Sequence, residues 1–406
     1  MESAFKYLLV GGGVASVNAV LGIREHDPDG TIAIAGSELH VPYDRPPLSK
    51  SFLANPERTL DDVSSKFDSF YPEHGVTLLP GHQALRIELG RQRVAFDNGA
   101  TIGYERLLLA TGSRPKPLQV RGLGYAPTFP LRTIEDAMRV RDVAQPGMKV
   151  VIVGAGFVGM EVASVLAAKG LDVTVLCQEA QPWGLFASPE VGAYVRGEFA
   201  VHGVRFFTGE TVAAITPSSE VATQSGMVLP CDFVVVACGV DLNVEFALES
   251  GLYGDRRTGI ACDSLMLTSE PNVFAAGDVA CFYDEVLGKH WHCEHHLNAK
   301  WTGFAAGANM ANAGVPYDKV AYVWSDLFDM HMILRGDAEV LRPSVKLGDV
   351  SAGEFVELHY DETGVIKTGL AMSHNEPSLD PIADTLESLI RAHAKADSVS
   401  ASDFGL

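Results

Sequence analysis

Cysteine is scarce in this chain, and its placement excludes paired-thiol chemistry. Six cysteines are scattered between positions 177 and 293, and no CxxC motif occurs among them. Scattered, unpaired cysteines without a secretory context are typical of reduced thiols in the cytosol. We therefore predict a cytoplasmic protein with neither a disulfide framework nor a metal site.

Basic residues and uninterrupted apolar runs are also few. The sequence has 31 lysines and arginines against 51 acidic residues, a formal net charge of −20, which argues against nucleic acid or an anionic membrane as partner. The most apolar stretch, residues 150–168, carries Glu161 in its middle. We interpret it as a buried strand and its helix rather than a membrane span. A length of 406 residues is enough for two or three domains.

Residues 6–50 contain the pattern around which the rest of the chain is arranged. An apolar run ends at Gly11-Gly12-Gly13, a helical pattern follows, and a second apolar run ends near Glu38. This order of strand, glycine turn, helix and strand is the βαβ unit that binds a dinucleotide. Gly11 permits the tight turn, Gly13 lets the backbone approach a pyrophosphate at the helix N-terminus, and Glu38 is placed to accept from a ribose.

One glycine fingerprint is weak evidence, but this chain has two. Residues 149–176 repeat the pattern with Gly154, Gly156 and Gly159 all present. Two dinucleotides in one chain are what a flavoprotein needs when it accepts hydride from a nicotinamide coenzyme. The pair therefore predicts an α/β protein with two Rossmann-like domains, one for FAD and one for NAD.

Smaller features fill in the organisation. The loop 41–50 is stiffened by prolines and presents Arg45 and Lys50, either as a rigid solvated connection or, as we favour, beside a cofactor. Asp278 follows a buried run and needs hydrogen-bond donors. We expect a helical excursion over 55–75, and one sheet built from segments near 204–209, 212–216 and 233–238. A hairpin around 361–364 and a later helix predict a small C-terminal α+β domain.

Five short runs occur in a fixed order around the two βαβ units: YDRPPLSK, LLATG, LRT, FAAGDVA and Trp324-Ser325-Asp326. On these runs the chain resembles the FAD-dependent NAD(P)H:ferredoxin reductases of bacterial cytochrome P450 and Rieske oxygenase systems, which have the glutathione-reductase-like fold. The resemblance implies an FAD domain in two segments, 1–114 and 247–322. It also implies an inserted NAD(P) domain, 115–246, and a C-terminal domain, 323–406.

The resemblance also implies the site residues. FAD would be bound by residues from both FAD segments and their neighbours: Gly11, Gly13, Ala15, Glu38, Arg45, Lys50, the backbone at Ala84, Arg132, Asp278, the stretch around His296, and Trp324 beside the isoalloxazine. NAD(P)H would be bound through Gly154, Gly156, Gly159 and Gly239. The catalytic pair would be Lys50 and Glu161, which meet near flavin N5.

Three positions depart from the family pattern. Cys177 stands where relatives carry an acid, Glu294-His295-His296 replaces a run that ends in tryptophan, and Thr302 replaces a glutamine. The first departure bears on coenzyme choice. Because the turn from Cys177 to Phe186 has no basic residue to neutralise a 2′-phosphate, we expect NADH to be preferred over NADPH. Either Glu179 or Gln178 would then bind the ribose.

We therefore predict that the protein transfers a hydride from NADH to FAD. It would then deliver single electrons to an iron–sulfur ferredoxin that serves an oxygenase. Dithiol chemistry is excluded because residues 38–55 contain no cysteine. Two alternatives are a flavoprotein reductase or oxidase acting on oxygen, a quinone or another small acceptor, and an NADH-gated interaction protein resembling apoptosis-inducing factor. The expected assembly is a monomer or homodimer, with no nucleic acid or membrane partner.

Overall fold

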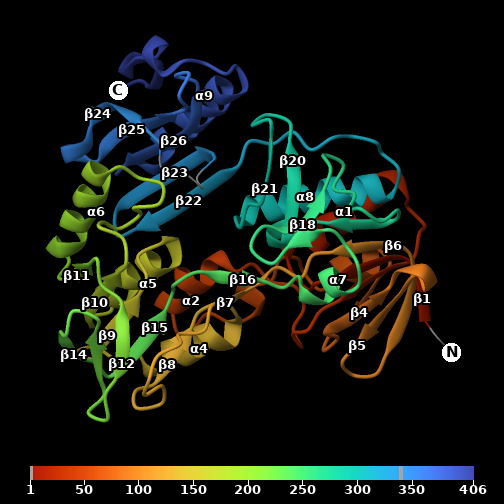
Figure 1. Cartoon of the computed structure of the whole chain (residues 1–406), viewed down its shortest axis with the longest axis horizontal. Coiled ribbons are helices and arrows are strands. Elements are labelled where there is room, and N and C mark those ends of the chain that lie inside the picture. The colour runs from red at the N-terminus through yellow and green to blue at the C-terminus, as the bar shows by residue number, and fades with distance from the viewer. Residues whose placement is uncertain (1–2, 338–341) are drawn as a thin grey trace. The chain divides into compact units, whose positions relative to one another are not determined.

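The computed structural model describes residues 3–337 and 342–406, and the chain divides into two compact units (Figure 1). Unit 1 comprises Met1–Asp44, Thr59–Arg114 and Asp241–Ala321, and unit 2 comprises Arg45–Arg58, Pro115–Val240 and Tyr322–Leu406. Two of the five unit boundaries fall within strands, one in β7 (Ser113–Pro115) and one in β16 (Val240–Leu242). The domain bounds given in the sequence analysis stay a prediction.

Unit 1 is built on a seven-stranded sheet of order β3-β2-β1-β6-β5-β4, with β19 pairing to β6. The strands β1, β2, β3, β6 and β19 are parallel, and the β4–β5–β6 part is antiparallel. The strand bounds are β1 Ser3–Val10, β2 Ile32–Ala35, β3 Val76–Leu79, β4 Ala84–Glu88, β5 Arg93–Phe96, β6 Thr101–Leu109 and β19 Val273–Ala275.

Two helices of unit 1, α1 (Val14–His26) and α8 (His296–Met310), lie against each other (Figure 1). Their backbones come so close that a Cβ at Gly303 would overlap the carbonyl oxygen of Ala15, and one at Gly307 that of Ala19. This explains why the sequence of α8 is rich in alanine and glycine. The contact holds α1, the helix that follows the first glycine turn, against the rest of the unit.

The remainder of unit 1 consists of short elements. A four-stranded sheet has the order β17-β18-β20-β21, with bounds Gly254–Asp255, Gly259–Cys262, Ala280–Asp284 and Lys289–Trp291. The short helices are α3 (Phe70–Glu73) and α7 (Glu245–Glu249). The helical excursion expected over 55–75 is therefore wrong for most of its length, because only Asp61–Val63 and Phe70–Glu73 are helical there.

Unit 2 contains an all-parallel sheet of order β11-β10-β9-β15-β8. Its strands are β8 Thr128–Pro130, β9 Lys149–Val153, β10 Asp172–Cys177, β11 Arg205–Thr208 and β15 Phe233–Val236, and its helices are α2 Ser51–Ala54, α4 Ile134–Val143, α5 Phe157–Ala168 and α6 Pro189–Val201. The segment near 212 was expected in this sheet. That expectation is wrong, because β12 (Val212–Ile215) lies in a separate antiparallel sheet, where it pairs with β13 (Glu220–Thr223), which pairs in turn with β14 (Val228–Pro230).

The C-terminal part of unit 2 is an antiparallel sheet of order β22-β23-β26-β25-β24 with α9 (Leu379–Arg391) packed on it (Figure 1). The strands are β22 Tyr322–Leu327, β23 Met330–Gly336, β24 Ser344–Asp349, β25 Glu354–Tyr360 and β26 Ile366–Ser373. The helix predicted after the hairpin is α9, and its buried face includes Ile382, Leu386 and Ile390.

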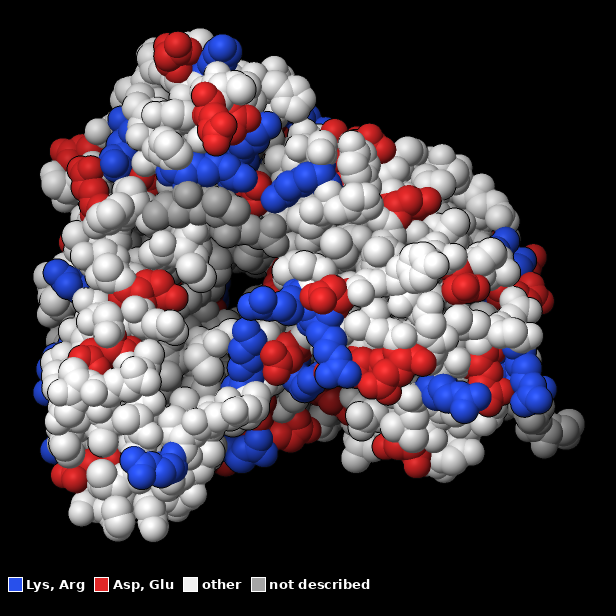
Figure 2. Space-filling view, in the orientation of Figure 1, with Lys and Arg blue, Asp and Glu red and all other residues white. Residues whose placement is uncertain are grey.

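The predicted fold class is confirmed: the chain is an α/β protein with Rossmann-like parallel sheets and a C-terminal α+β part. Among the described helices, none combines the length and the apolar character that a bilayer crossing requires. Although the chain is acidic, the face drawn in Figure 2 carries lysine and arginine side chains among the aspartates and glutamates.

Candidate functional site

The first glycine turn joins β1 to α1 in unit 1. Gly11 has φ +130°, and a Cβ there would overlap the carbonyl oxygen of Ala110, so only glycine fits. Gly13 is the N-cap of α1, without a side-chain cap, and a Cβ at Gly13 would meet no atom within 4 Å. The turn therefore offers an open helix N-terminus, the chemistry that binds a pyrophosphate. Ala15 is 5% exposed and lies in the contact with α8.

Ser16 occupies the third position of the fingerprint, where glycine is usual. Its hydroxyl donates to the carbonyl oxygen of Gly11 over 2.6 Å, and the residue is fully buried. Serine therefore replaces the close packing of a glycine by a hydrogen bond that fixes the turn. Beyond β2, the Tyr43 hydroxyl donates to Oε2 of Glu38. This bond fixes the carboxylate that the sequence predicts as a ribose acceptor.

The third segment of unit 1 brings Asp278 to the end of β19, in the short helix Gly277–Val279. Asp278 is 7% exposed, and the Ser113 hydroxyl donates to its Oδ2 over 2.7 Å. The donor that a buried aspartate needs is thus supplied in part by the chain itself. Ala84 opens β4 opposite Phe96, where the strand register shifts.

The family departure at Thr302 has a structural explanation. Thr302 is fully buried, and its hydroxyl accepts from the backbone N–H of Gly277 over 3.0 Å while donating to the Asn298 carbonyl over 2.7 Å. The residue therefore joins α8 to the turn that carries Asp278. Nearby, burial lowers the pKa of His295 to about 4 and lowers the pKa of His296, so neutral imidazoles are favoured at the start of α8.

The second glycine turn, in unit 2, repeats the first. Gly154 has φ +109°, and its Cβ would overlap the Ala237 carbonyl oxygen. Gly156 is the N-cap of α5, without a side-chain cap and with open space where a Cβ would stand, and Gly159 packs against the Gly154 carbonyl. This again leaves an open helix N-terminus for a pyrophosphate. The residues of both turns thus fit the two dinucleotides that the sequence predicts.

Two residues extend this second turn. Gly239 follows β15 with φ +96°, and its carbonyl accepts from the backbone N–H of Lys116 over 3.0 Å. The Lys116 Nζ would stand 3.7 Å from a Cβ at Gly239. Lys116 is a cation that sequence reasoning missed, because it lies outside every recognised motif.

At the end of β10, the residue in place of the expected acid contacts a nearby carboxylate. Cys177 is fully buried, and its Sγ lies 3.4 Å from Oε2 of Glu179. Burial, together with this carboxylate, raises the pKa of Cys177 to about 12, so the thiol stays protonated and can donate. The Glu179 carboxylate is thereby drawn back to the strand end. Gln178, the alternative ribose ligand, is exposed.

The loop 41–50 places two of its predicted residues in unit 2. Arg45 donates from Nη1 to the carbonyl oxygen of Arg132 over 2.6 Å. The backbone N–H groups of Arg132 and Thr133 both donate to Oδ2 of Asp136, over 3.0 and 2.9 Å, in the capping box that opens α4. The LRT turn therefore starts helix α4 and accepts a hydrogen bond from the Arg45 guanidinium.

Lys50 and Glu161 form the ion pair expected of the catalytic residues. Lys50 Nζ lies 3.3 Å from Oε1 of Glu161, and the two side chains are 17% and 8% exposed. Glu161 accepts hydrogen bonds from Ser325, over 2.7 Å, and from Ser49. The Glu161 carboxylate projects from helix α5. It is thus held by residues of the loop 45–50 and of strand β22, all in unit 2. Neither serine was assigned a role from the sequence, although both lie in recognised runs.

Trp324 and Asp326 complete the surroundings of Lys50. The Lys50 ammonium lies 5.7 Å from the centroid of the Trp324 ring, within cation–π range. It also lies 3.6 Å from Oδ2 of Asp326. The ammonium therefore stands between two carboxylates and an indole face, which fixes a positive charge in a mostly buried place.

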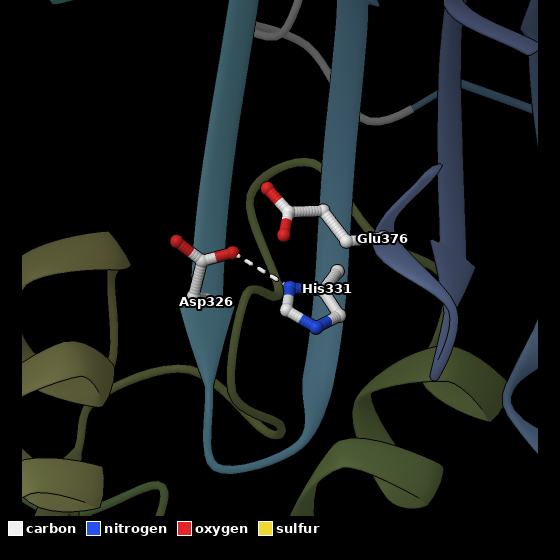
Figure 3. A group of neighbouring side chains, drawn as sticks. All are labelled: Asp326, His331 and Glu376. Atoms are coloured by element: carbon white, nitrogen blue, oxygen red, sulfur yellow. Dashed lines mark hydrogen bonds and ion pairs between the residues drawn. The ribbon is translucent and has the colours of Figure 1, made fainter. Parts of the chain in front are cut away.

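Among the described residues, one group of side chains could hold a metal ion: Asp326, His331 and Glu376, whose ligand atoms lie within 4.8 Å of one another (Figure 3). No metal site was predicted from the sequence. In the structure, Asp326 already accepts from His331 over 2.8 Å and pairs with Lys50. These contacts account for the geometry without an ion.

Comparison with known proteins places the chain in a family. Residues 5–303 match the pyridine nucleotide-disulphide oxidoreductase model, and the chain belongs to that family of flavoproteins. Rhodocoxin reductase of Rhodococcus erythropolis is 33% identical over 84% of this chain and 81% of that protein. Human apoptosis-inducing factor 3 is 31% identical over 95% of this chain and 64% of that protein.

The fold comparison agrees. The crystal structure of the covalent putidaredoxin reductase–putidaredoxin complex superposes with a TM-score of 0.90, at 27% identity, over 100% of this chain and 96% of that chain. The resemblance to ferredoxin reductases seen in the sequence is therefore confirmed at the level of family and fold.

Proposed function

We propose that this protein is an NADH-dependent ferredoxin reductase, which accepts a hydride from NADH on bound FAD and passes the electrons singly to a ferredoxin serving an oxygenase. The observation that carries the proposal is the pair of open helix N-termini, at Gly13 and Gly156, in a chain whose relatives include ferredoxin reductases. When bound, FAD supplies the step from two-electron to one-electron transfer.

The residues of the chain would bind and orient the two dinucleotides. The N-terminus of α1 and the Glu38 carboxylate would hold the pyrophosphate and ribose of FAD, and Asp278 would accept a further hydrogen bond from it. The N-terminus of α5 would hold the pyrophosphate of NADH, with Glu179 at its ribose. Holding both molecules in place supplies proximity, which lowers the barrier to hydride transfer by making the step effectively unimolecular.

Lys50 would act by charge. A cation held beside the flavin stabilises the negative charge that the ring system gains on reduction. Glu161 would keep Lys50 in place, since it is itself held by Ser49 and Ser325. Neither residue needs to transfer a proton for hydride transfer, so we assign both an electrostatic role.

Three other chemistries fit less well. A disulfide reductase needs paired cysteines beside the first helix, and residues 38–55 have none. A flavoprotein oxidase would consume oxygen rapidly without any added protein. An NADH-gated interaction protein resembling apoptosis-inducing factor would instead hold a long-lived complex of reduced flavin and oxidised coenzyme. The last two are distinguished from a ferredoxin reductase by kinetics.

The proposal is tested by adding NADH to the FAD-loaded protein with a panel of ferredoxins and following cytochrome c reduction. We expect at least one ferredoxin to raise the rate well above that of the reductase alone. If every ferredoxin fails while oxygen or a quinone turns over rapidly, the acceptor assignment is wrong. Slow flavin reoxidation by every acceptor would favour the interaction protein.

Lys50→Met tests the electrostatic assignment separately. We expect slower flavin reduction by NADH and a lower flavin midpoint potential. Lys6→Met is a matched control, because Lys6 also pairs with an acid, Asp27, at a distance of 2.7 Å on the first strand. Equal behaviour of the two variants would remove Lys50 from the mechanism.

The compartment is part of the proposal. None of the six cysteines forms a disulfide bond, a state typical of the reducing cytosol, and we infer a cytoplasmic protein. A monomer or homodimer is the assembly we expect, and sedimentation of the FAD-loaded protein would decide between them.

A further inference from the structure

Asp326 and His331 face each other across the β22–β23 hairpin. They are direct partners in the antiparallel register, and the His331 Nδ1 lies 2.8 Å from Oδ1 of Asp326. Figure 3 shows the carboxylate and the imidazole pointing toward one another from neighbouring strands, with the Glu376 carboxylate beside the ring. Because an ionised carboxylate can only accept, Nδ1 carries the proton of this bond.

The second oxygen of Asp326 faces Lys50. The distance from Oδ2 to Nζ is 3.6 Å, and the side chains of Asp326 and Lys50 are 42% and 17% exposed. A chain of contacts thus runs from His331 through Asp326 and Lys50 to buried Glu161. Asp326 is the most exposed of the residues in this chain that pair with Lys50. A carboxylate this exposed keeps its rotamer freedom unless a second bond holds it.

We propose that His331 is a positioning residue for Lys50. By donating to one oxygen of Asp326, it turns the other oxygen toward the lysine, which is then held between two carboxylates rather than by Glu161 alone. This inference rests on the proposed role of Lys50 beside the flavin. His331 lies outside the short runs that carry the family resemblance. Its place opposite Asp326 is set by the register of the hairpin.

A divalent cation is the competing occupant of the same three side chains. Two features favour the hydrogen bond. Lys50 already occupies the second oxygen of Asp326, and a cation bound there would be repelled by the ammonium. Glu376, the third member, is exposed, so its carboxylate is compensated by water. The test therefore includes zinc as a probe.

The first variants separate the hydrogen bond from the packing. His331→Leu removes the donor, whereas His331→Asn keeps an N–H group bonded to Cγ, as Nδ1 is. In stopped-flow reduction of the FAD-loaded protein by NADH, we expect the limiting rate of His331→Leu to fall about two- to fivefold, the effect expected when a partly exposed ion pair is lost. The Kd for NADH should not change, and His331→Asn should recover most of the rate.

A matched control exists in the same unit. Lys367 pairs with Asp361, at 3.4 Å, and its side chain is 21% exposed. Its substitution by leucine should leave the limiting rate unchanged, because this pair lies at the turn between β25 and β26 and no hydrogen bond or ion pair among the described residues links it to Lys50. The flavin midpoint potential is a second readout. It should move downward in His331→Leu, in the same direction as in Lys50→Met.

Nuclear magnetic resonance of the flavin-free protein supplies a readout independent of activity. The ring ¹⁵N signals of His331 should show a protonated Nδ1, and Asp326→Asn should change them. A deprotonated Nδ1 in wild type would overturn the inference. So would equal rates for His331→Leu and wild type, or equal losses in His331→Leu and His331→Asn.

Two further experiments complete the test, one with zinc and one with ferredoxins as electron acceptors. If removal of metal by EDTA slows wild type and zinc restores the rate only when His331 is present, the site is a metal site and the inference is wrong. The proposed function fails differently: flavin would be reduced by NADH, with the His331 effect intact, yet no ferredoxin would accept the electrons.

Discussion

We propose that Glu179 binds the coenzyme ribose in place of the acid missing at the end of β10, so its replacement should weaken the preference for NADH. Its Oε2 lies 3.4 Å from the buried Cys177 thiol, which is held protonated by a pKa of about 12. The thiol can therefore donate to the carboxylate and hold it near the strand end, where dinucleotide folds bind a ribose.

The expected magnitude follows from the bonds lost. A hydrogen bond to a charged group contributes about 1.5–3 kcal/mol, which corresponds to about 10- to 100-fold in kcat/KM. Because Glu179 is half-buried, we expect the lower end for Glu179→Ala, about a tenfold loss with NADH. The loss with NADPH should be smaller, since removing the carboxylate also removes its repulsion of the 2′-phosphate.

Variants of Cys177 test how the carboxylate is held. Cys177→Ser keeps a donor of similar size and should retain the coenzyme ratio, whereas Cys177→Ala removes the donor and should lower the ratio a few-fold. Gln178→Ala is the matched control: the side chain is the exposed neighbour, and its loss should change nothing. Ferricyanide reduction is the suitable assay, because it reports coenzyme use without any ferredoxin.

The results that would refute this reasoning are specific. A clear preference of wild type for NADPH would contradict the coenzyme assignment. An unchanged ratio in Glu179→Ala would remove Glu179 from the ribose site, and a fall in Gln178→Ala would assign that site to Gln178 instead. If Cys177→Ser and Cys177→Ala behaved alike, the thiol would have no positioning role.

Three further predictions concern cofactor retention, acid stability and the acceptor. Asp278→Ala should lose FAD during gel filtration, because a buried hydrogen-bonding group is removed, and full flavin occupancy would contradict this. The pKa of Glu357 is lowered to about 2: burial raises it, but bonds from His359 and Ser188 outweigh that effect. The stability this carboxylate contributes is therefore present above pH about 4.5 and lost as the pH falls toward 2, and Glu357→Gln should flatten the dependence of the thermal unfolding midpoint on pH over this range. Ferredoxin reduction should slow as salt rises, because an acidic partner must dock on local basic groups of a chain with net charge −20, and a salt-independent rate would indicate apolar docking.

Local signals made the dinucleotide folds predictable from the sequence. A glycine turn between an apolar run and a helical pattern is decided by a few neighbouring residues, and both turns have the open helix N-termini that the sequence implied. The capping box at Thr133 and Asp136 was predictable for the same reason. Strand partners are different, because they depend on distant segments, and β12 was therefore assigned to the wrong sheet.

Departures from a family pattern could be noticed in the sequence but not explained by it. Thr302 is one case: its hydroxyl accepts from Gly277 and donates to Asn298, two partners that lie on different elements. Cys177 is another, because the pattern shows the loss of an acid but cannot show that the thiol contacts the Glu179 carboxylate. Both replacements work through side-chain contacts that no periodicity encodes.

The contact between Asp326 and His331 could not be predicted from the sequence. Leu327 and Met330 pair directly, so the hairpin closes through a two-residue turn of Phe328 and Asp329. Such turns usually place glycine or asparagine at a positive φ, yet Phe328 takes φ +56°. Its ring is stacked 3.7 Å from that of His202, and this packing offsets the backbone strain. Without a glycine the turn could not be recognised, and the register that brings His331 to Asp326 could not be inferred from the sequence.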